Sequence, residues 1–332
     1  MKLNYMALNY HKLLGANKTM KHYLLQKLFS LFLVLFGISL AAFVLGILTP
    51  GNPAELALSK GGYSPTPEQI KEIEIEMGLD VPYPVQYVKW LNRVLHGDLG
   101  TSYASSRPVR QELIERIPIT LKLGSCAMVV TCINGILIGC IAAAFRGKGI
   151  DKIVQLGINI SLSLPAFWFA LLLILFFSES LGWLPTSGNG GIRFLIMPTT
   201  VLALPASATA ARLMRSSLLA EFGKPYYLAA IARGTNRFEQ IIKNALPNAI
   251  VPVIALMGNT LGGLLGGSVI VETIFALPGI GSYAIEAIYG RDYPALQGYV
   301  LVTGCVYVLV SLLVDGISLL LDPKVRVGRR RL

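Results

Sequence analysis

The sequence predicts an all-α membrane protein with six transmembrane helices and a small helical extracytoplasmic cap after the first of them. Hydrophobic residues make up 54% of the 332 residues and charged residues only 14%, and the mean hydropathy is +0.60. This balance is too apolar for an ordinary soluble domain. Apolar runs of about 20 residues, long enough to cross a bilayer, recur along the chain. The six runs are Leu28–Leu48, Leu123–Phe145, Ile153–Phe177, Ile192–Ala211, Ile250–Thr273 and Leu296–Leu321.

Basic residues gather in alternate connections between these runs, and their placement predicts the orientation. Lysines and arginines are abundant before the first run, after the sixth, and between runs two and three and runs four and five. The short connections on the other side carry one each, Arg193 and Arg291. This is the positive-inside pattern, which predicts that both termini lie in the cytoplasm. It also explains the net charge of +11 without nucleic acid as a partner.

The order of polar and apolar segments predicts the domain organisation. Leu28–Leu48 is too long and apolar for a typical signal-peptide core, so we expect an uncleaved anchor. Met20 is a natural start for such an anchor, and the sequence leaves open whether residues 1–19 are genuine. The expected segments are a cytoplasmic N-terminal segment, 1–27, the first transmembrane helix, 28–48, an extracytoplasmic cap, 49–118, a five-helix core, 119–322, and a basic cytoplasmic tail, 323–332.

The polar segment after the first run carries helix signals. Thr66 and Gln69 have the spacing of a capping box, with a proline between them at the first helical position, and Gly78 can end that helix. A second short helix is expected after Pro84. Its expected apolar face is Val88, Leu91 and Leu95. The favoured interpretation is a cap packed on the spans, and the alternative, which is compatible with it, is a docking surface for an extracytoplasmic partner.

The chain lacks the motifs of several kinds of catalytic site. It has no GxxxxGK[ST] sequence for ATP and no HExxH sequence, and its three histidines lie outside the apolar runs. We therefore expect no catalytic residue, metal ligand or cofactor in this chain, which disfavours a membrane enzyme. An autonomous secondary transporter remains a weaker alternative. Such proteins usually have polar coupling sites near the membrane centre and internal repeats, and this sequence shows neither clearly. The four cysteines, which form no CxxC motif, are expected to pack within the spans: Cys126, Cys132, Cys140 and Cys305.

The connection between runs four and five is patterned as two helices. Ala229 and Ala230 give the first helix a low-profile surface, and Gly234 ends it. Asn236 and Glu239 have the spacing of a capping box for a second helix, which leads toward the fifth run. A short helix with small side chains, braced by a second, is suited to insertion into a groove on another protein. The alternative, a helix pair lying on lipid, would favour bulkier apolar residues.

This connection resembles the cytoplasmic loop of the integral-membrane permease subunits of binding-protein-dependent ABC transporters, in the dipeptide/oligopeptide/nickel branch. The family pattern is Glu-Ala-Ala, three residues, Gly, nine residues, Ile, one residue, Leu-Pro. Leu228 replaces the glutamate and Asn244 the isoleucine. The residues that match in register are Ala229, Ala230, Gly234, Leu246 and Pro247.

The resemblance extends beyond the loop. Typical stretches of this branch are MGLDVPYPVQYVKWLNRVLHGDLGTSY at 77–103, SRPVRQELIERIPITLKL at 106–123, VETIFALPGIGSYAIEAIYGRDYPALQG after the fifth run and LLDPKVRVG at 320–328. The resemblance implies a type-1 importer permease in the bacterial cytoplasmic (inner) membrane, with no catalytic activity of its own. It implies a coupling loop, 221–247, that binds one of two cytoplasmic ABC ATPase subunits, which carry ATP and Mg.

The resemblance also implies partners and a substrate class. A second, homologous permease subunit would complete the translocation pathway, and an extracytoplasmic solute-binding protein would deliver the substrate. Di- or oligopeptides are the expected substrates on the breadth of the family alone. Nickel, another metal chelate or glutathione is the alternative, because the motifs are common to all these permeases.

Overall fold

The computed structural model describes residues 29–48, 51–58 and 65–321, and the expected terminal segments 1–27 and 323–332 lie outside the described residues. Within these ranges all regular elements are helical. They are the first helix, Phe29–Leu48, α2 (Pro53–Leu58), α3 (Pro67–Met77), α4 (Tyr83–Leu95), α5 (Val109–Ala144), α6 (Gly149–Ser163), α7 (Ala166–Leu173), η2 (Ile174–Ser180), α8 (Ile192–Phe222), α9 (Pro225–Ala232), α10 (Arg237–Glu239), η3 (Gln240–Ala245), α11 (Leu246–Ile274), α12 (Ile280–Tyr289) and α13 (Tyr293–Leu321).

The described residues contain five helices that are long and apolar enough to cross a membrane, and a bent pair that raises the number to six. The bent pair corrects the expectation of one helix over Ile153–Phe177. There, Gly149–Ser163 and Ala166–Ser180 meet at an angle of 105°. The break falls at Leu164, which is extended with ψ of 123°, directly before Pro165. Proline lacks an N–H group and disfavours helical conformation in the residue before it, so the first helix ends there.

Helix α5 begins earlier than the sequence predicts. It runs for 36 residues from Val109, so residues 109–118, which we expected in the cap, form its first turns. The charged residues in these turns lower the local hydropathy, and an apolar run therefore does not mark the true start of the helix. At about 1.5 Å per residue, α5 is longer than a bilayer requires, and its charged end can project beyond the apolar layer.

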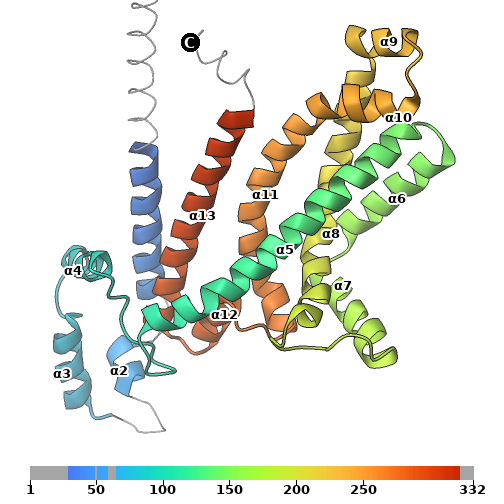
Figure 1. The fold of residues 1–332 in the computed structure, drawn as a ribbon. Coiled ribbons are helices and arrows are strands. Elements are labelled where there is room, and N and C mark those ends of the chain that lie inside the picture. The colour runs from blue at the N-terminus through green and yellow to red at the C-terminus, as the bar shows by residue number, and fades with distance from the viewer. Residues whose placement is uncertain (1–28, 49–50, 59–64, 322–332) are drawn as a thin grey trace, which may run out of the picture.

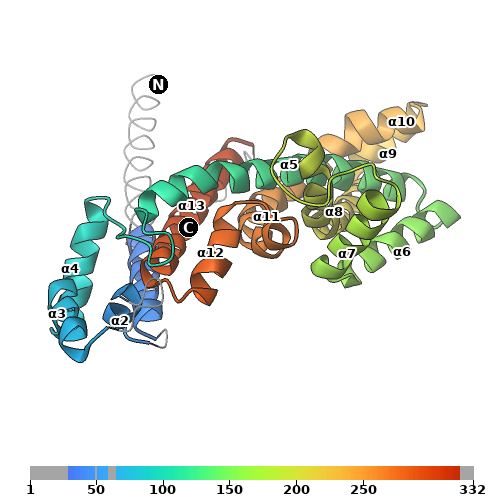
Figure 2. The ribbon, with the colours of Figure 1, turned by 90° about the horizontal axis from the view of Figure 1, so that it is seen from below.

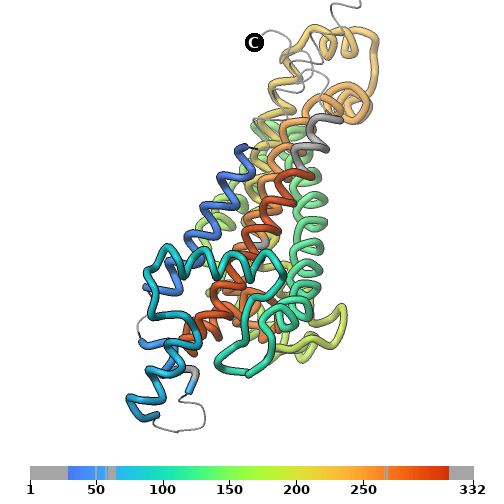
Figure 3. Tube along the Cα trace, turned by 90° about the vertical axis from the view of Figure 1, so that its left-hand side faces the viewer, coloured from blue at the N-terminus to red at the C-terminus, as the bar shows by residue number. Residues whose placement is uncertain are grey.

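The cap and the 221–247 loop lie at opposite ends of the molecule. In Figure 1, α9 and α10 are at the top, whereas α2, α3 and α12 are at the bottom. Seen from below in Figure 2, α5 runs along one side of α13, α11 and α8. The side view in Figure 3 again separates the cap from the loop by the length of the helix bundle.

Helices α5 and α8 pack with almost no space between their backbones. A Cβ atom added to Gly135 would lie 2.5 Å from Cβ of Ala210, and one added to Gly139 would lie 2.5 Å from Cβ of Met214. Small residues four positions apart allow such close approach in membrane helices. This contact joins the long diagonal helix to the helix that leads into the 221–247 loop.

The cap packs on the spans, through a face of α4 that includes only Leu91 of the three residues expected there. The Phe43 ring of the first helix lies 5.3 Å from Tyr87 and 5.6 Å from Trp90, measured between ring centroids. Trp90 is 8% exposed, whereas two residues of the expected face, Val88 and Leu95, are 63% and 75% exposed. Aromatic side chains bury more apolar area than Val or Leu, so Tyr87 and Trp90, rather than Val88 and Leu95, pack against the membrane helices.

Candidate functional site

The 221–247 loop is anchored by Glu221 in the last turn of α8. The Lys224 ammonium lies 2.6 Å from the Glu221 carboxylate, and the Tyr226 hydroxyl donates a hydrogen bond to the same carboxylate. Asn248 in α11 donates to the Tyr226 hydroxyl at 3.2 Å. Burial raises the pKa of Tyr226, and its bond to Glu221 raises it further, so the phenol stays protonated. These contacts connect the end of α8, the start of α9 and the first turns of α11.

Helix α9 ends at Gly234 in a Schellman motif. Gly234 has φ of +73°, the left-handed region that glycine adopts without steric cost. Its N–H donates to the Ile231 carbonyl at 2.9 Å, and the Thr235 N–H donates to the Ala230 carbonyl at 3.4 Å. The Thr235 hydroxyl donates to the same Ala230 carbonyl at 2.8 Å. This pattern satisfies carbonyls that a helix end otherwise leaves free, and it reverses the chain direction.

The second helix of the loop is continuous with the fifth span rather than separate from it. Asn236 accepts a hydrogen bond from the Glu239 N–H at 2.8 Å, which confirms the expected N-cap. The chain then passes through the π-helical turn η3 directly into α11, with Pro247 in its first turn. Local π-helical adjustment is one way in which a membrane helix accommodates proline. The loop and the fifth span are therefore joined by one continuous helix.

Helix α9 has one buried and one exposed face. Tyr227 and Ala230 are buried, with 6% and 0% of their surface exposed, and the Tyr227 ring stacks on Phe222 at 4.8 Å. The opposite side, called here the α9 outer face, consists of Leu228, Ala229, Ile231 and Ala232. Both alanines were expected at the contact surface, but only Ala229 lies on the outer face. Ala230 is buried, because three or four residues per turn place it beside Tyr227. The α9 outer face is also less flat than predicted, since two of its members are large: Leu228 is 55% exposed and Ile231 is 48% exposed.

The buried face of α9 rests on the ends of the long helices. Tyr227 belongs to a buried cluster with Met214 and Leu218 of α8 and with Ile241 and Ala245 of η3. The half-buried side chain at position 246, which matches the family motif, packs against the same cluster, whereas Pro247 is exposed. The five motif residues thus occupy different positions. Ala229 lies on the outer face, Ala230 beneath it and Gly234 at the turn, and the Leu-Pro pair at 246–247 lies at the entrance to α11.

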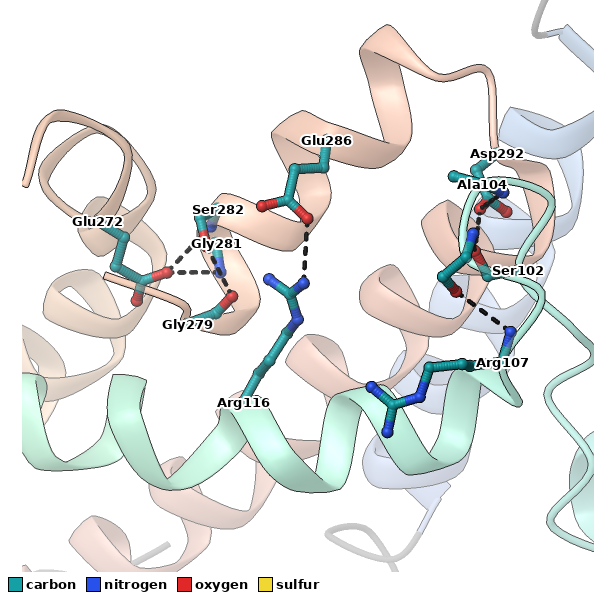
Figure 4. Close-up of polar contacts among 11 residues, drawn as sticks. Ser102, Ala104, Arg107, Arg116, Glu272, Gly279, Gly281, Ser282, Glu286 and Asp292 are labelled. Atoms are coloured by element: carbon teal, nitrogen blue, oxygen red, sulfur yellow. Dashed lines mark hydrogen bonds and ion pairs between the residues drawn. The ribbon is translucent and has the colours of Figure 1, made fainter. Parts of the chain in front are cut away.

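The opposite end of the molecule holds a buried carboxylate that sequence reasoning missed. Glu272 of α11 is fully buried and accepts hydrogen bonds from the backbone N–H groups of Gly281 and Ser282 at 2.7 and 3.0 Å (Figure 4). The Thr120 hydroxyl of α5 donates to its other oxygen at 2.7 Å. The Ile280 N–H in turn donates to the Thr120 oxygen at 3.0 Å. One carboxylate and one hydroxyl therefore satisfy three free N–H groups at the start of α12.

A second buried carboxylate, Asp292, joins the cap to α13 (Figure 4). It accepts hydrogen bonds from the Ser102 hydroxyl at 2.5 Å, the Ala104 N–H at 3.1 Å and the Ala295 N–H at 3.2 Å. Between these two sites, Arg116 pairs with Glu286 at 3.1 Å. The partners are up to 190 residues apart in sequence, and no local sequence signal links them.

The fold matches solved structures of importer membrane subunits. Two inward-facing crystal structures of the MetNI methionine ABC transporter superpose with TM-scores of 0.56 and 0.54. The first is 20% identical to the chain and covers 64% of it and 97% of the solved chain. At this identity the match establishes the fold alone, which is the helical fold of type-1 importer membrane subunits.

Sequence comparison identifies the family. Residues 135–327 match the family described as the binding-protein-dependent transport system inner membrane component, and residues 20–124 match its N-terminal model. The chain belongs to this family.

Several named relatives resemble nearly the whole chain. A protein of Brucella abortus (strain 2308), named as a peptide transport system permease, is 37% identical over 301 residues, 88% of this chain and 95% of the relative. The glutathione transport system permease protein GsiC of Pectobacterium atrosepticum is 36% identical, and the dipeptide transport system permease protein DppB of Alkalihalophilus pseudofirmus is 33% identical. Each of these two comparisons covers 92% of this chain and 99% of the relative.

The family defines what kind of protein this is. It is a multi-pass subunit of an ABC importer in the inner membrane, and it works with ATPase and solute-binding partners. It is a transport subunit and not itself an enzyme.

Proposed function

We propose that this chain forms half of the translocation pathway of an ATP-driven importer of di- or oligopeptides, and that its α9 outer face binds the ATPase. A second, homologous permease supplies the other half of the pathway. Two ATPase subunits hold ATP and Mg, and this chain binds no cofactor. Both termini and the 221–247 loop lie in the cytoplasm, as the positive-inside pattern predicts, and the cap lies outside.

The observation that carries this proposal is the two-faced geometry of α9. Its inner face is fixed to α8 and η3 through Tyr227, while Leu228 and Ile231 project away from the protein. Exposed apolar side chains on a rigidly braced helix are suited to a groove on a partner protein. Because η3 continues into α11, closure of two ATPases would act on the spans through a helix rather than through a flexible linker.

Peptides are the proposed substrates because the named relatives transport compounds with peptide groups. The related protein from Brucella abortus is named as a peptide permease and the one from Alkalihalophilus pseudofirmus as a dipeptide permease. The one from Pectobacterium atrosepticum is named as a glutathione permease. Uptake of a labelled dipeptide, in competition with glutathione and with a nickel chelate, tests this choice. Competition by the nickel chelate alone would contradict it.

The partners are tested by gentle detergent extraction of the tagged protein from its native membranes, followed by identification of the proteins that co-purify. We expect a P-loop ATPase and a second permease. A matched preparation of Leu228→Asp, with a charge in the centre of the α9 outer face, should lose the ATPase and keep the second permease. Recovery of the wild-type chain alone, from a preparation that preserves other membrane complexes, would contradict the proposal.

A further inference from the structure

A pocket lined by a few polar side chains lies between α5, α6 and α8, which are neighbours in Figure 1. Its volume is about 400 Å³, within the range of small-molecule sites. Most of its lining is apolar, but each helix contributes a polar side chain. These are Asn134 from α5, Ser161 from α6, and Thr200 and Ser207 from α8.

The Ser207 hydroxyl distinguishes this pocket from a packing defect. Ser207 is only 5% exposed, and its oxygen has no hydrogen-bond partner among the described residues. The neighbouring hydroxyls are satisfied within their own helices: Ser161 donates to the Gly157 carbonyl and Thr200 to the Ile196 carbonyl, each at 2.8 Å. A buried hydroxyl without a partner is costly, especially in a membrane, and a ligand in the pocket that bonds to it would remove this cost.

The polar lining continues toward the cap end of the bundle. An adjoining pocket of about 440 Å³ shares Val130 and Thr200 with the first and also contains Thr199. Thr199 is 6% exposed, and its hydroxyl likewise lacks a partner in the described part of the chain. Eight residues of helix separate Thr199 from Ser207, a rise of about 12 Å. The two unpartnered hydroxyls therefore lie at different depths along the bundle, one in each of the adjoining pockets.

The lining defines the chemistry of the ligand. Among the described residues, no charged side chain lines either pocket, so charge attraction does not select the ligand there. Serine and threonine hydroxyls and the asparagine amide each donate and accept hydrogen bonds. A peptide group also offers one donor and one acceptor and carries no net charge.

The loop end of the first pocket is tied by polar contacts between α6 and α8. Arg212 donates to the Asn159 side chain at 2.9 Å, and Arg215 pairs with Asp151 at 2.8 Å. Both arginines lie beyond Ser207 in the direction of the 221–247 loop. Because α8 leads directly into that loop, the pocket lies between helices whose separation the proposed ATPase movement can change.

We propose that this pocket binds a peptide group of the solute during its passage, with the Ser207 hydroxyl and the Asn134 amide as its hydrogen-bonding groups. This inference rests on the proposed function for its ligand, a peptide. It adds a solute-contacting site within the membrane, on the α5–α6–α8 side of this subunit. Recognition there is by hydrogen bonds to the backbone common to all peptides, so the site tolerates different peptide side chains.

The test uses the complete importer, with its ATPases, second permease and binding protein, in proteoliposomes, and labelled dialanine as the probe. Ser207→Ala removes the hydroxyl, and Gly157→Leu fills the pocket from a position where an added Cβ meets no atom within 4 Å. Thr209→Val is the matched control, because Thr209 is exposed, lies outside the pocket and bonds to the Pro205 carbonyl at 3.0 Å.

We expect Ser207→Ala to lower the initial rate of dialanine uptake about threefold to tenfold, the effect of one hydrogen bond. Gly157→Leu should lower it further. Both variants should keep the second permease and the ATP hydrolysis stimulated by the binding protein, and Thr209→Val should transport at the wild-type rate.

Wild-type uptake by both pocket variants would overturn the inference. Loss of the second permease from these variants would also overturn it, because this face would then be a contact between subunits. Failure of the wild-type importer to transport dialanine, while it transports another solute, would instead contradict the proposed substrate class and remove the peptide as ligand of this pocket. The two failures are therefore distinguishable.

Discussion

Arg215 donates two hydrogen bonds of 2.8 Å to the carboxylate of Asp151, and so ties α8 to the first turn of α6. The Asp151 side chain is 3% exposed and that of Arg215 is 22% exposed. The same carboxylate accepts hydrogen bonds from the Gly147 N–H at 2.9 Å and the Gln155 amide at 3.1 Å. Each carboxylate oxygen thus has two donors, which is the condition under which a buried ion pair can be stable.

Replacement of Asp151 should destabilise the protein. Asp151→Ala leaves the Arg215 guanidinium without its partner in a mostly buried position, and losing one member of such a pair costs about 3 kcal/mol or more. The measurement is thermal unfolding of the purified complex in detergent. Glu239→Gln is the control, because the Glu239–Lys243 pair is exposed and should contribute less than about 1 kcal/mol. Equal losses in the two variants would contradict this interpretation.

Gly234→Trp should abolish uptake and leave membrane insertion intact. A side chain at φ of +73° costs about 1–2 kcal/mol, and tryptophan adds bulk at the turn beside the α9 outer face. An added Cβ meets no atom within 4 Å, so conformational strain and obstruction of the partner, rather than an internal clash, cause the loss. The measurement is uptake normalised to the amount of protein in the membrane.

Gly147 provides the matched control for that variant. It has φ of +75°, and an added Cβ there also meets no atom within 4 Å, but it lies in the turn between α5 and α6. Gly147→Trp introduces the same backbone strain outside the 221–247 loop and should retain most of the uptake. If both variants lose uptake equally, strain alone explains the effect.

Removal of the Glu272 carboxylate should free the start of α12. In Glu272→Ala, the Gly281 and Ser282 N–H groups lose a charge-assisted acceptor, which contributes about 1.5–3 kcal/mol. We expect their amide hydrogen exchange to accelerate about tenfold to a hundredfold. Glu286→Gln breaks only the more exposed pair with Arg116 and should leave this exchange unchanged. Unaltered exchange in Glu272→Ala would show that packing, not the carboxylate, holds α12.

Local signals in the sequence predicted local structure well. The capping box at Thr66 is present with both of its bonds. The Gln69 N–H donates to the Thr66 hydroxyl oxygen at 3.4 Å, and the Thr66 N–H donates to the Gln69 side-chain oxygen at 2.9 Å. The cap at Asn236 and the turn at Gly234 also follow from residue types that favour one backbone geometry. These features depend on a few neighbouring residues, so a single sequence is enough to find them.

Features that depend on tertiary packing were missed. The contact of Tyr227 with α8 determines that Ala230 faces the protein interior. The motif contains two adjacent alanines and does not indicate which of them is buried. The bond between Thr120 and Glu272 joins residues 152 positions apart, and only the folded arrangement of α5 and α11 brings them together. The break at Pro165 was within reach of sequence reasoning, because proline in an apolar run is a recognised helix breaker.

The most direct test of the central claim, that the α9 outer face binds the ATPase, is site-specific cross-linking in native membranes. Ala229→Cys and Ala230→Cys are introduced in a background in which the four native cysteines are replaced by alanine, and each is coupled to a thiol-directed photo-cross-linker. The exposed position 229 should cross-link to the ATPase subunit, whereas the buried position 230 should react poorly and yield little product. Cross-linking of position 229 to lipid alone, or of both positions equally to the ATPase, would contradict the account.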